Sequence, residues 1–77
     1  MTKRELSRRE KLMRKAIRLA GGQAALGRGM GKSQQYVWTL LKNPHRVSAE
    51  DAVGIERATD GKVTRLDLRP DLFGETA

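Results

Sequence analysis

The 77-residue chain has no cysteine and a single histidine, His45. Without cysteine there is no disulfide framework and no thiolate zinc site, and one histidine cannot form a metal centre alone. Its apolar runs are a few residues long, far short of the ~18 that a membrane span needs, and no apolar segment follows the charged N-terminus. We therefore expect a cytoplasmic protein that uses no cofactor, metal or membrane.

Acidic residues are missing from the middle of the chain. Residues 20–47 carry four basic residues and no acidic one, and residues 1–19 carry eight basic residues against two acidic ones. Residues 48–77 reverse this balance, with four basic and seven acidic residues. The first two thirds therefore suit a polyanion, and the last third does not. Charge alone does not distinguish nucleic acid from acidic lipid or simple solubility.

Hydrophobic periodicity predicts two helices in the N-terminal half. Apolar residues recur at three-and-four spacing over residues 6–20, and Gly21-Gly22 ends this first helix. Its basic face is either a solvated surface or a phosphate contact, and the helix alone does not decide between them. A short second helix spans residues 22–30, and Gly31 suits the left-handed turn that would end it.

Hydroxyl residues mark the starts of the later helices. Ser33 and Ser48 are typical N-caps, and Asp51 completes a capping box with Ser48. Thr64 caps a last helical turn, with a β-strand over 62–68 as the competing prediction. These three helices are expected to end near Lys42, Thr59 and Pro70.

These elements predict one all-α domain over residues 6–73, a compact four- to five-helix bundle. Residues 1–5 are expected to form a disordered basic N-terminal arm, and residues 74–77 a frayed C-terminus. The segment "GMGKS" at 29–33 has the look of a phosphate-binding loop. However, that loop needs a glycine where Leu26 stands and a preceding strand, so we reject a nucleotide site.

The helix over residues 33–42 sorts its side chains into two faces. At ~100° per residue, five polar or aromatic side chains share an arc of about 140°, while Val37 and Leu40 lie opposite. Those five are Gln34, Gln35, Trp38, Thr39 and Lys42. A glutamine amide matches the donor and acceptor of adenine in the DNA major groove, and threonine can contact a thymine methyl. The polar face therefore indicates base contacts.

Flanking groups suit the DNA backbone. Lys32 and Lys42 stand at either end of this row and can reach phosphates, as can Ser33 at the helix N-terminus. Beyond the helix, Arg46 is expected to add a phosphate contact. His45 fits a solvated loop better.

A resemblance supports this interpretation. Residues 23–42 resemble the helix-turn-helix of Cro and lambda-repressor-like phage regulators, and residues 21–73 are similar to the YdaS-like antitoxin/Cro group of small prophage repressors. The segments that carry the resemblance are "GGQ" (21–23), "AL" (25–26), Gly31, "SQQ" (33–35), Val37, "IERAT" (55–59), "GKVTR" (61–65) and "LRPD" (68–71).

The family implies specific roles for residues in this chain. Gln23 would brace against a phosphate at the start of its helix. The DNA-facing positions would be Ser33, Gln34, Gln35, Trp38 and Thr39. Two departures stand out, because the family usually has an apolar residue at Lys32 and a small polar one at Trp38.

Trp38 has two interpretations of similar weight. The indole could lie against sugars or thymine methyls, or wedge between bases. Alternatively, it covers apolar surface of its own fold or of a subunit contact. Another side chain, Glu56, falls on the inner side of its helix and needs a partner, so we predict an ion pair with Arg65 or Arg69.

The leading hypothesis is a sequence-specific DNA-binding transcriptional regulator, a Cro-like repressor or YdaS-like antitoxin, with helix 33–42 in the major groove. One reading helix offers few base contacts, so we expect a homodimer on double-stranded DNA. The protein would be bacterial or phage-encoded, cytoplasmic and nucleoid-associated. The alternative is a protein-interaction module whose main partner is a toxin or another regulator. No arrangement of acids with His or Cys suggests an enzyme.

Overall fold

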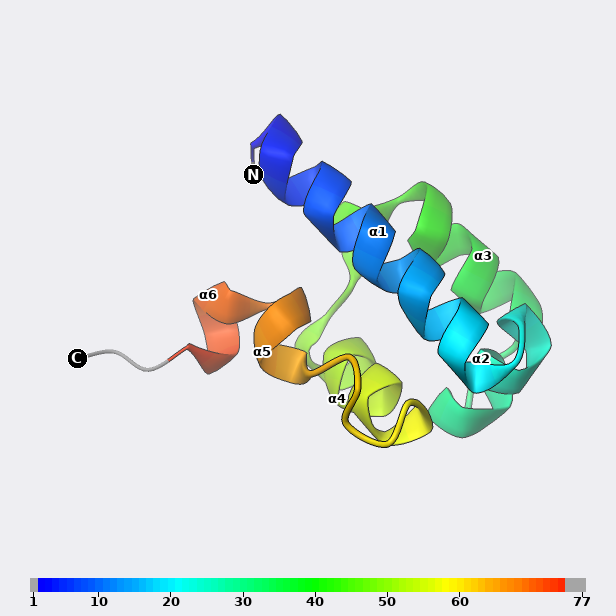
Figure 1. The fold of residues 1–77 in the computed structure, drawn as a ribbon. Coiled ribbons are helices and arrows are strands. Elements are labelled where there is room, and N and C mark those ends of the chain that lie inside the picture. The colour runs from blue at the N-terminus through cyan, green and yellow to red at the C-terminus, as the bar shows by residue number, and fades with distance from the viewer. Residues whose placement is uncertain (1, 75–77) are drawn as a thin grey trace.

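A computed structural model describes residues 2–74, and all regular structure in that range is helical (Figure 1). The elements in chain order are α1 (Lys3–Ala20), α2 (Gln23–Met30), α3 (Gln34–Lys42), the 3-10 turn η1 (Pro44–Arg46), α4 (Ala49–Ala58), α5 (Arg65–Leu68) and α6 (Pro70–Phe73). The all-α prediction is confirmed. The competing strand over 62–68 is wrong, because residues 65–68 form α5.

The capping residues that the sequence marks do begin their helices. The hydroxyl of Ser33 accepts a hydrogen bond from the Tyr36 amide at 3.1 Å. Ser48 and Asp51 exchange two side-chain-to-backbone bonds, both 3.1 Å long, and so form the expected capping box. Thr64 forms the same motif at the start of α5. These bonds satisfy amides that the first turn of a helix leaves free.

Both ends of the chain differ from expectation. Residues 3–5, predicted to be part of a disordered arm, are the first turn of α1, because the Thr2 hydroxyl caps the Glu5 amide at 3.1 Å. Pro70 ends α5 but also opens α6, a turn that the sequence pattern did not predict. Proline suits the first position of a helix, where its missing N–H would be unpaired anyway. Residue 1 and residues 75–77, the rest of the two predicted ends, lie outside the described residues.

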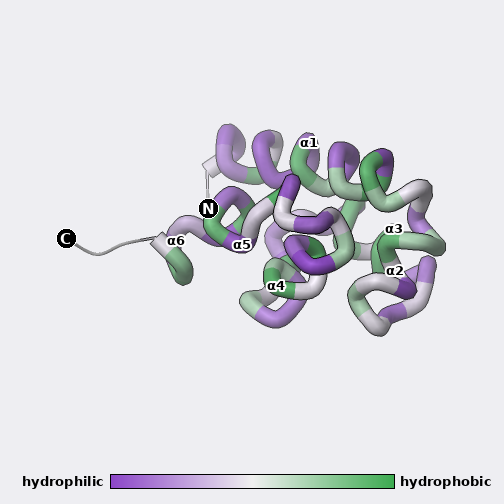
Figure 2. The backbone as a smooth tube through the Cα atoms, turned by 60° about the horizontal axis from the view of Figure 1, so that its bottom comes forward, coloured by the Kyte–Doolittle hydropathy of each residue, from purple (hydrophilic) through white to green (hydrophobic). Residues whose placement is uncertain are grey.

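The core lies where α1, α2 and α3 contact one another and α4 packs beneath α2. Figure 2 shows α1 along one edge of the molecule, with hydrophobic and hydrophilic segments alternating along it. The fully buried side chains that fill this core include Met13, Leu26, Val37, Leu40, Val47, Ile55, Val63 and Leu68. The expected inner face of α3, Val37 and Leu40, is thus confirmed.

Two glycines of α2 allow close packing. A Cβ on Gly27 would lie 2.9 Å from the backbone of Ser33, so only glycine lets α2 approach the start of α3 this closely. A Cβ on Gly29 would lie 2.6 Å from the Cβ of Ala58, which fixes the contact between α2 and α4.

Arginine side chains fasten the C-terminal turns to the body. Arg65 bonds to Glu56 through its backbone amide at 2.7 Å and its guanidinium at 3.2 Å, which confirms the predicted ion pair. These hydrogen bonds lower the pKa of the Glu56 carboxyl. Arg69 donates to the Val47 carbonyl at 2.7 Å and pairs with Asp71 at 2.8 Å.

Arg9 is a buried cation that the sequence pattern did not single out. Only 6% of the residue is exposed, and its guanidinium donates to the Pro44 carbonyl at 3.2 Å. Burial lowers the pKa of this guanidinium, and the nearby positive charge of Arg69 lowers it further. Arg9 and Arg69 therefore hold the two ends of η1, the turn that follows α3.

Candidate nucleic-acid interface

The segment from α2 to α3 has the form of a helix-turn-helix. Gly31 adopts a left-handed conformation, with φ of 72°, and the amides of Gly31 and Lys32 bond back to the last turn of α2. Leu26 and Val37 are fully buried between the two helices. The turn is therefore fixed by backbone bonds on one side and core packing on the other.

The outer face of α3 carries the side chains predicted to read bases. Gln34 and Gln35 are exposed, and 49% of Trp38 is accessible to solvent. The outer face of α3 thus presents two amide side chains and an accessible indole together, the groups that the sequence assigned to base contacts.

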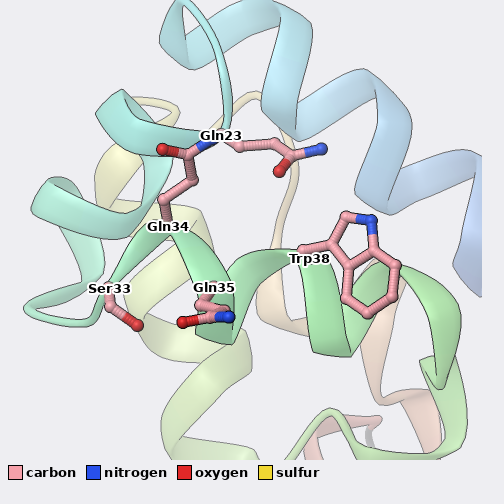
Figure 3. A pocket seen from close by; sticks show the side chains of 5 residues that line it. All are labelled: Gln23, Ser33, Gln34, Gln35 and Trp38. Carbon is pink, nitrogen blue, oxygen red and sulfur yellow. The ribbon is translucent and has the colours of Figure 1, made fainter.

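Five of the predicted site residues line one shallow concave patch, which we call the reading patch (Figure 3). Its members are Gln23, Ser33, Gln34, Gln35 and Trp38. Figure 3 shows Gln34 and Gln35 on the first turn of α3 and Trp38 one turn later, while Gln23 reaches over the patch from the start of α2. Three amide side chains thus line the same patch, each able to donate and accept hydrogen bonds.

The starts of α2 and α3 are the only α-helix N-termini among residues 2–74 without an acidic residue in the first turn. An acidic side chain in the first turn offsets the partial positive charge of a helix N-terminus. At α2 and α3 that charge is left for another anion. Both helix starts carry members of the reading patch, Gln23 on α2 and Gln34 with Gln35 on α3.

Tyr36 turns away from the reading patch and joins α3 to α4. Its hydroxyl lies 2.9 Å from both carboxylate oxygens of Asp51, which is 3% exposed. Burial raises the pKa of the Tyr36 hydroxyl, and the hydrogen bond to Asp51 raises it further. The acid that caps α4 therefore also holds the orientation of α3. The sequence pattern assigned Tyr36 to neither face of this helix.

The other predicted site residues lie around the patch rather than in it. Lys42 places its ammonium 5.8 Å from the centre of the Trp38 ring, and Arg46 is exposed on η1. Lys32 faces α4 instead, 4.0 Å from Glu50 and 5.3 Å from the centre of the Tyr36 ring. An exposed pair of this length is weak, so Lys32 can still turn toward a phosphate.

Thr39 is half-buried, and its hydroxyl donates to the Gln35 carbonyl at 3.0 Å. The helix backbone therefore occupies the polar group of Thr39 and leaves its methyl group for an apolar contact.

Features of two other classes of site are not found within residues 2–74. None of the helices there combines the length and apolar character required to cross a bilayer. Within the same range, no three side chains from His, Cys, Asp and Glu gather as a metal ligand set would.

Comparisons with known proteins find a matching family and a similar curated protein. The family described as "Bacterial toxin YdaS" matches residues 13–77. The chain is also 39% identical over 59 residues to the Escherichia coli (strain K12) protein named "Putative transcriptional regulator YdaS", a match that covers 77% of this chain. The chain spans about 60% of the length of that curated relative. No solved structure matches the chain significantly.

Proposed function

The chain belongs to the YdaS family, and on that premise we propose that it is a sequence-specific DNA-binding transcriptional regulator that inserts α3 into the major groove. The name of the Escherichia coli relative fits a regulator, and the DNA-binding mechanism is our proposal from the side chains of this chain.

The reading patch is the observation that carries the proposal. Its amides suit the N6 and N7 groups of adenine, and the exposed Trp38 suits sugars or thymine methyl groups. The acid-free starts of α2 and α3 suit phosphates on either side of the groove. Base-directed and phosphate-directed groups therefore lie beside each other, as a groove-reading helix requires.

Roles follow from these positions. Gln34, Gln35, Trp38 and the methyl group of Thr39 would face bases. The phosphate-directed residues would be Gln23, Lys32, Ser33, Lys42 and Arg46. A helix of nine residues reads only a few base pairs, so we propose a cytoplasmic homodimer on a short palindromic operator.

Selection of bound sequences from random duplex DNA by the purified protein tests the proposal. A recovered palindrome supports it, and its half-site spacing reports the symmetry of the dimer. If each subunit neutralises about four to six phosphates, log K falls with log salt at a slope of about −4 to −5 per subunit. A slope near zero would exclude DNA as the ligand.

Two variants separate base contacts from phosphate contacts. Gln34→Ala combined with Gln35→Ala should abolish sequence preference while the protein stays folded, because both side chains are exposed. The matched control, Lys42→Ala, should weaken binding to all sequences alike and reduce the salt slope by about 1. Unchanged preference in the double glutamine variant would refute the role of the reading patch.

A second candidate function is a protein-interaction module with a toxin or another regulator as its main partner. The exposure of Trp38 favours it, because tryptophan is a frequent anchor of protein interfaces. The double glutamine variant should leave such a partner bound, whereas Trp38→Ala should release it. Partner binding by the double glutamine variant and by Trp38→Ala therefore distinguishes the two candidate functions.

A further inference from the structure

The outer face of α1 carries a continuous line of cations that the proposed reading mechanism does not use. At 100° per residue, seven basic side chains fall within an arc of about 140°. We call this the basic ridge. Its members are Lys3, Arg4, Arg8, Lys11, Arg14, Lys15 and Arg18, and all seven are exposed. The two acidic residues of α1, Glu5 and Glu10, fall outside the arc.

The basic ridge is poorly neutralised. Arg14 lies 3.9 Å from Glu10, and Arg8 lies 4.0 Å from Asp67, both in exposed pairs. Within residues 2–74, the other five cations of the ridge form no ion pair. Three like-charged pairs stand four residues apart on it: Arg4 with Arg8, Lys11 with Lys15, and Arg14 with Arg18.

Like charges at this spacing weaken a helix, whereas a merely solvated face usually alternates the two signs. Repulsion within the ridge therefore destabilises α1, and a bound polyanion would reduce this repulsion. Four of its members, at positions 3, 4, 8 and 11, also precede the residues that the YdaS family matches. The N-terminal part of the ridge therefore lies outside the residues that the family comparison covers, and the other three members lie within them.

The chemistry of the ridge favours duplex DNA over other polyanions. Its only uncharged member within the arc is Ser7, so it offers no aromatic ring for stacking single-stranded bases. It also has no apolar wedge of the kind that seats a basic helix in a lipid surface. An α-helix of 18 residues is about 27 Å long, enough to follow phosphates of a duplex, which carries one charge per ~1.7 Å.

The ridge and the reading patch face different directions. α1 and α3 contact each other and α2. The buried residues of each helix, Met13 and Ala16 on α1 and Val37 and Leu40 on α3, belong to one shared core. The outward sides of α1 and α3 must therefore diverge. None of the ridge residues lines the reading patch.

We propose that the basic ridge of α1 binds the phosphates of a second DNA duplex, without regard to sequence, while α3 engages the first. The protein would then bring two DNA segments together. Engagement of the first duplex rests on the proposed function of α3, whereas binding by the ridge depends only on the charges of α1.

The test uses a biotinylated random-sequence duplex on beads, the 77-residue chain, and a fluorescent random-sequence duplex in solution. The ridge variant combines Lys11→Gln with Arg18→Gln. The matched control combines Lys62→Gln with Arg57→Gln, which removes one lysine and one arginine from exposed positions elsewhere. Circular dichroism confirms that both variants fold.

The wild-type protein and the control should capture the fluorescent duplex, and the ridge variant should lose this capture. Two lost phosphate contacts lower the slope of log K against log salt by about 1.8. Between 50 and 200 mM salt, the DNA affinity of the ridge variant should therefore fall by a factor about twelvefold smaller than that of the wild type. Equal capture by the ridge variant and the control would overturn the proposal. So would ridge-dependent binding to phosphatidylglycerol–phosphatidylcholine vesicles without any duplex capture.

A further variant separates this proposal from the proposed function. Gln34→Ala with Gln35→Ala should abolish sequence preference but leave ridge-dependent capture in place. If the wild-type protein shows no sequence preference, the proposed function fails, and loss of capture by the ridge variant still supports the ridge.

Discussion

Removal of the Tyr36 hydroxyl should destabilise the protein more than any comparable deletion on the outer face of α3. Tyr36→Phe keeps the ring and takes away the hydrogen-bond donor that lies 2.9 Å from each oxygen of Asp51. Asp51 is almost fully buried and retains its bond from the Ser48 amide. The variant therefore leaves a buried carboxylate with one partner fewer, not with none.

The magnitude follows from these contacts. A hydrogen bond to a charged group contributes about 1.5–3 kcal/mol, and the remaining Ser48 bond points to the lower end, about 1.5 kcal/mol. For a domain of this size, that loss lowers the melting temperature by about 6–12 °C. With a denaturant slope near ~1 kcal/mol/M, the urea midpoint should fall by about 1.5 M.

Urea unfolding followed by circular dichroism provides the assay, with Thr39→Val as the control. Thr39 also loses a hydroxyl, but its bond stays within α3, so the control should cost no more than ~0.5 kcal/mol. In an Asp51→Ala background, Tyr36→Phe should have little further effect, because the partner is already gone. A Tyr36→Phe cost equal to that of the control would refute the link between α3 and α4.

Two further predictions concern packing and pH. Gly29→Ala should destabilise the fold by about 1 kcal/mol net, because the clash with Ala58 exceeds the gain in helix propensity, and the added Ala58→Gly should restore part of the loss in thermal unfolding. Full stability of Gly29→Ala would contradict the close contact of α2 with α4. The bond to Arg69 lowers the pKa of Asp71 to about 2, so its stabilising contribution is complete above the ordinary carboxyl pKa near ~4 and is lost as pH falls toward 2. The stability gap between wild type and Asp71→Asn should therefore close over that range in acid titrations, and a constant gap would argue against the pair.

Local signals in the sequence predicted most of the helices because capping is local chemistry. Ser33, Ser48 and Thr64 each bond to an amide three residues later, so a short window contains both partners. The two faces of α3 were predictable for the same reason, since a fixed rotation per residue separates Gln34 from Val37. Whether the exposed face binds DNA stays a prediction.

Contacts between distant parts of the chain were not predictable in this way. Arg9 looks like any other basic residue of α1, and its partner, the Pro44 carbonyl, is 35 residues away. The need for glycine at position 29 becomes visible only in the fold, where Ala58 of α4 packs against it. Tyr36 bonds to Asp51, 15 residues away, and the sequence marked Asp51 only as a capping residue.

The distribution of acidic residues links stability to function in this chain. The α-helices outside the helix-turn-helix carry an acid in their first turn, and Glu56 and Asp71 hold the C-terminal turns through arginines. The starts of α2 and α3 and the outer face of α1 lack such acidic residues and the stabilisation that these would provide. If these surfaces were only solvated, acids there would stabilise the fold without harm. Placing an acid at position 24 or 35 should accordingly raise thermal stability and weaken DNA binding at the same time. If these surfaces did not bind DNA, the same substitutions would raise stability and leave DNA binding unchanged.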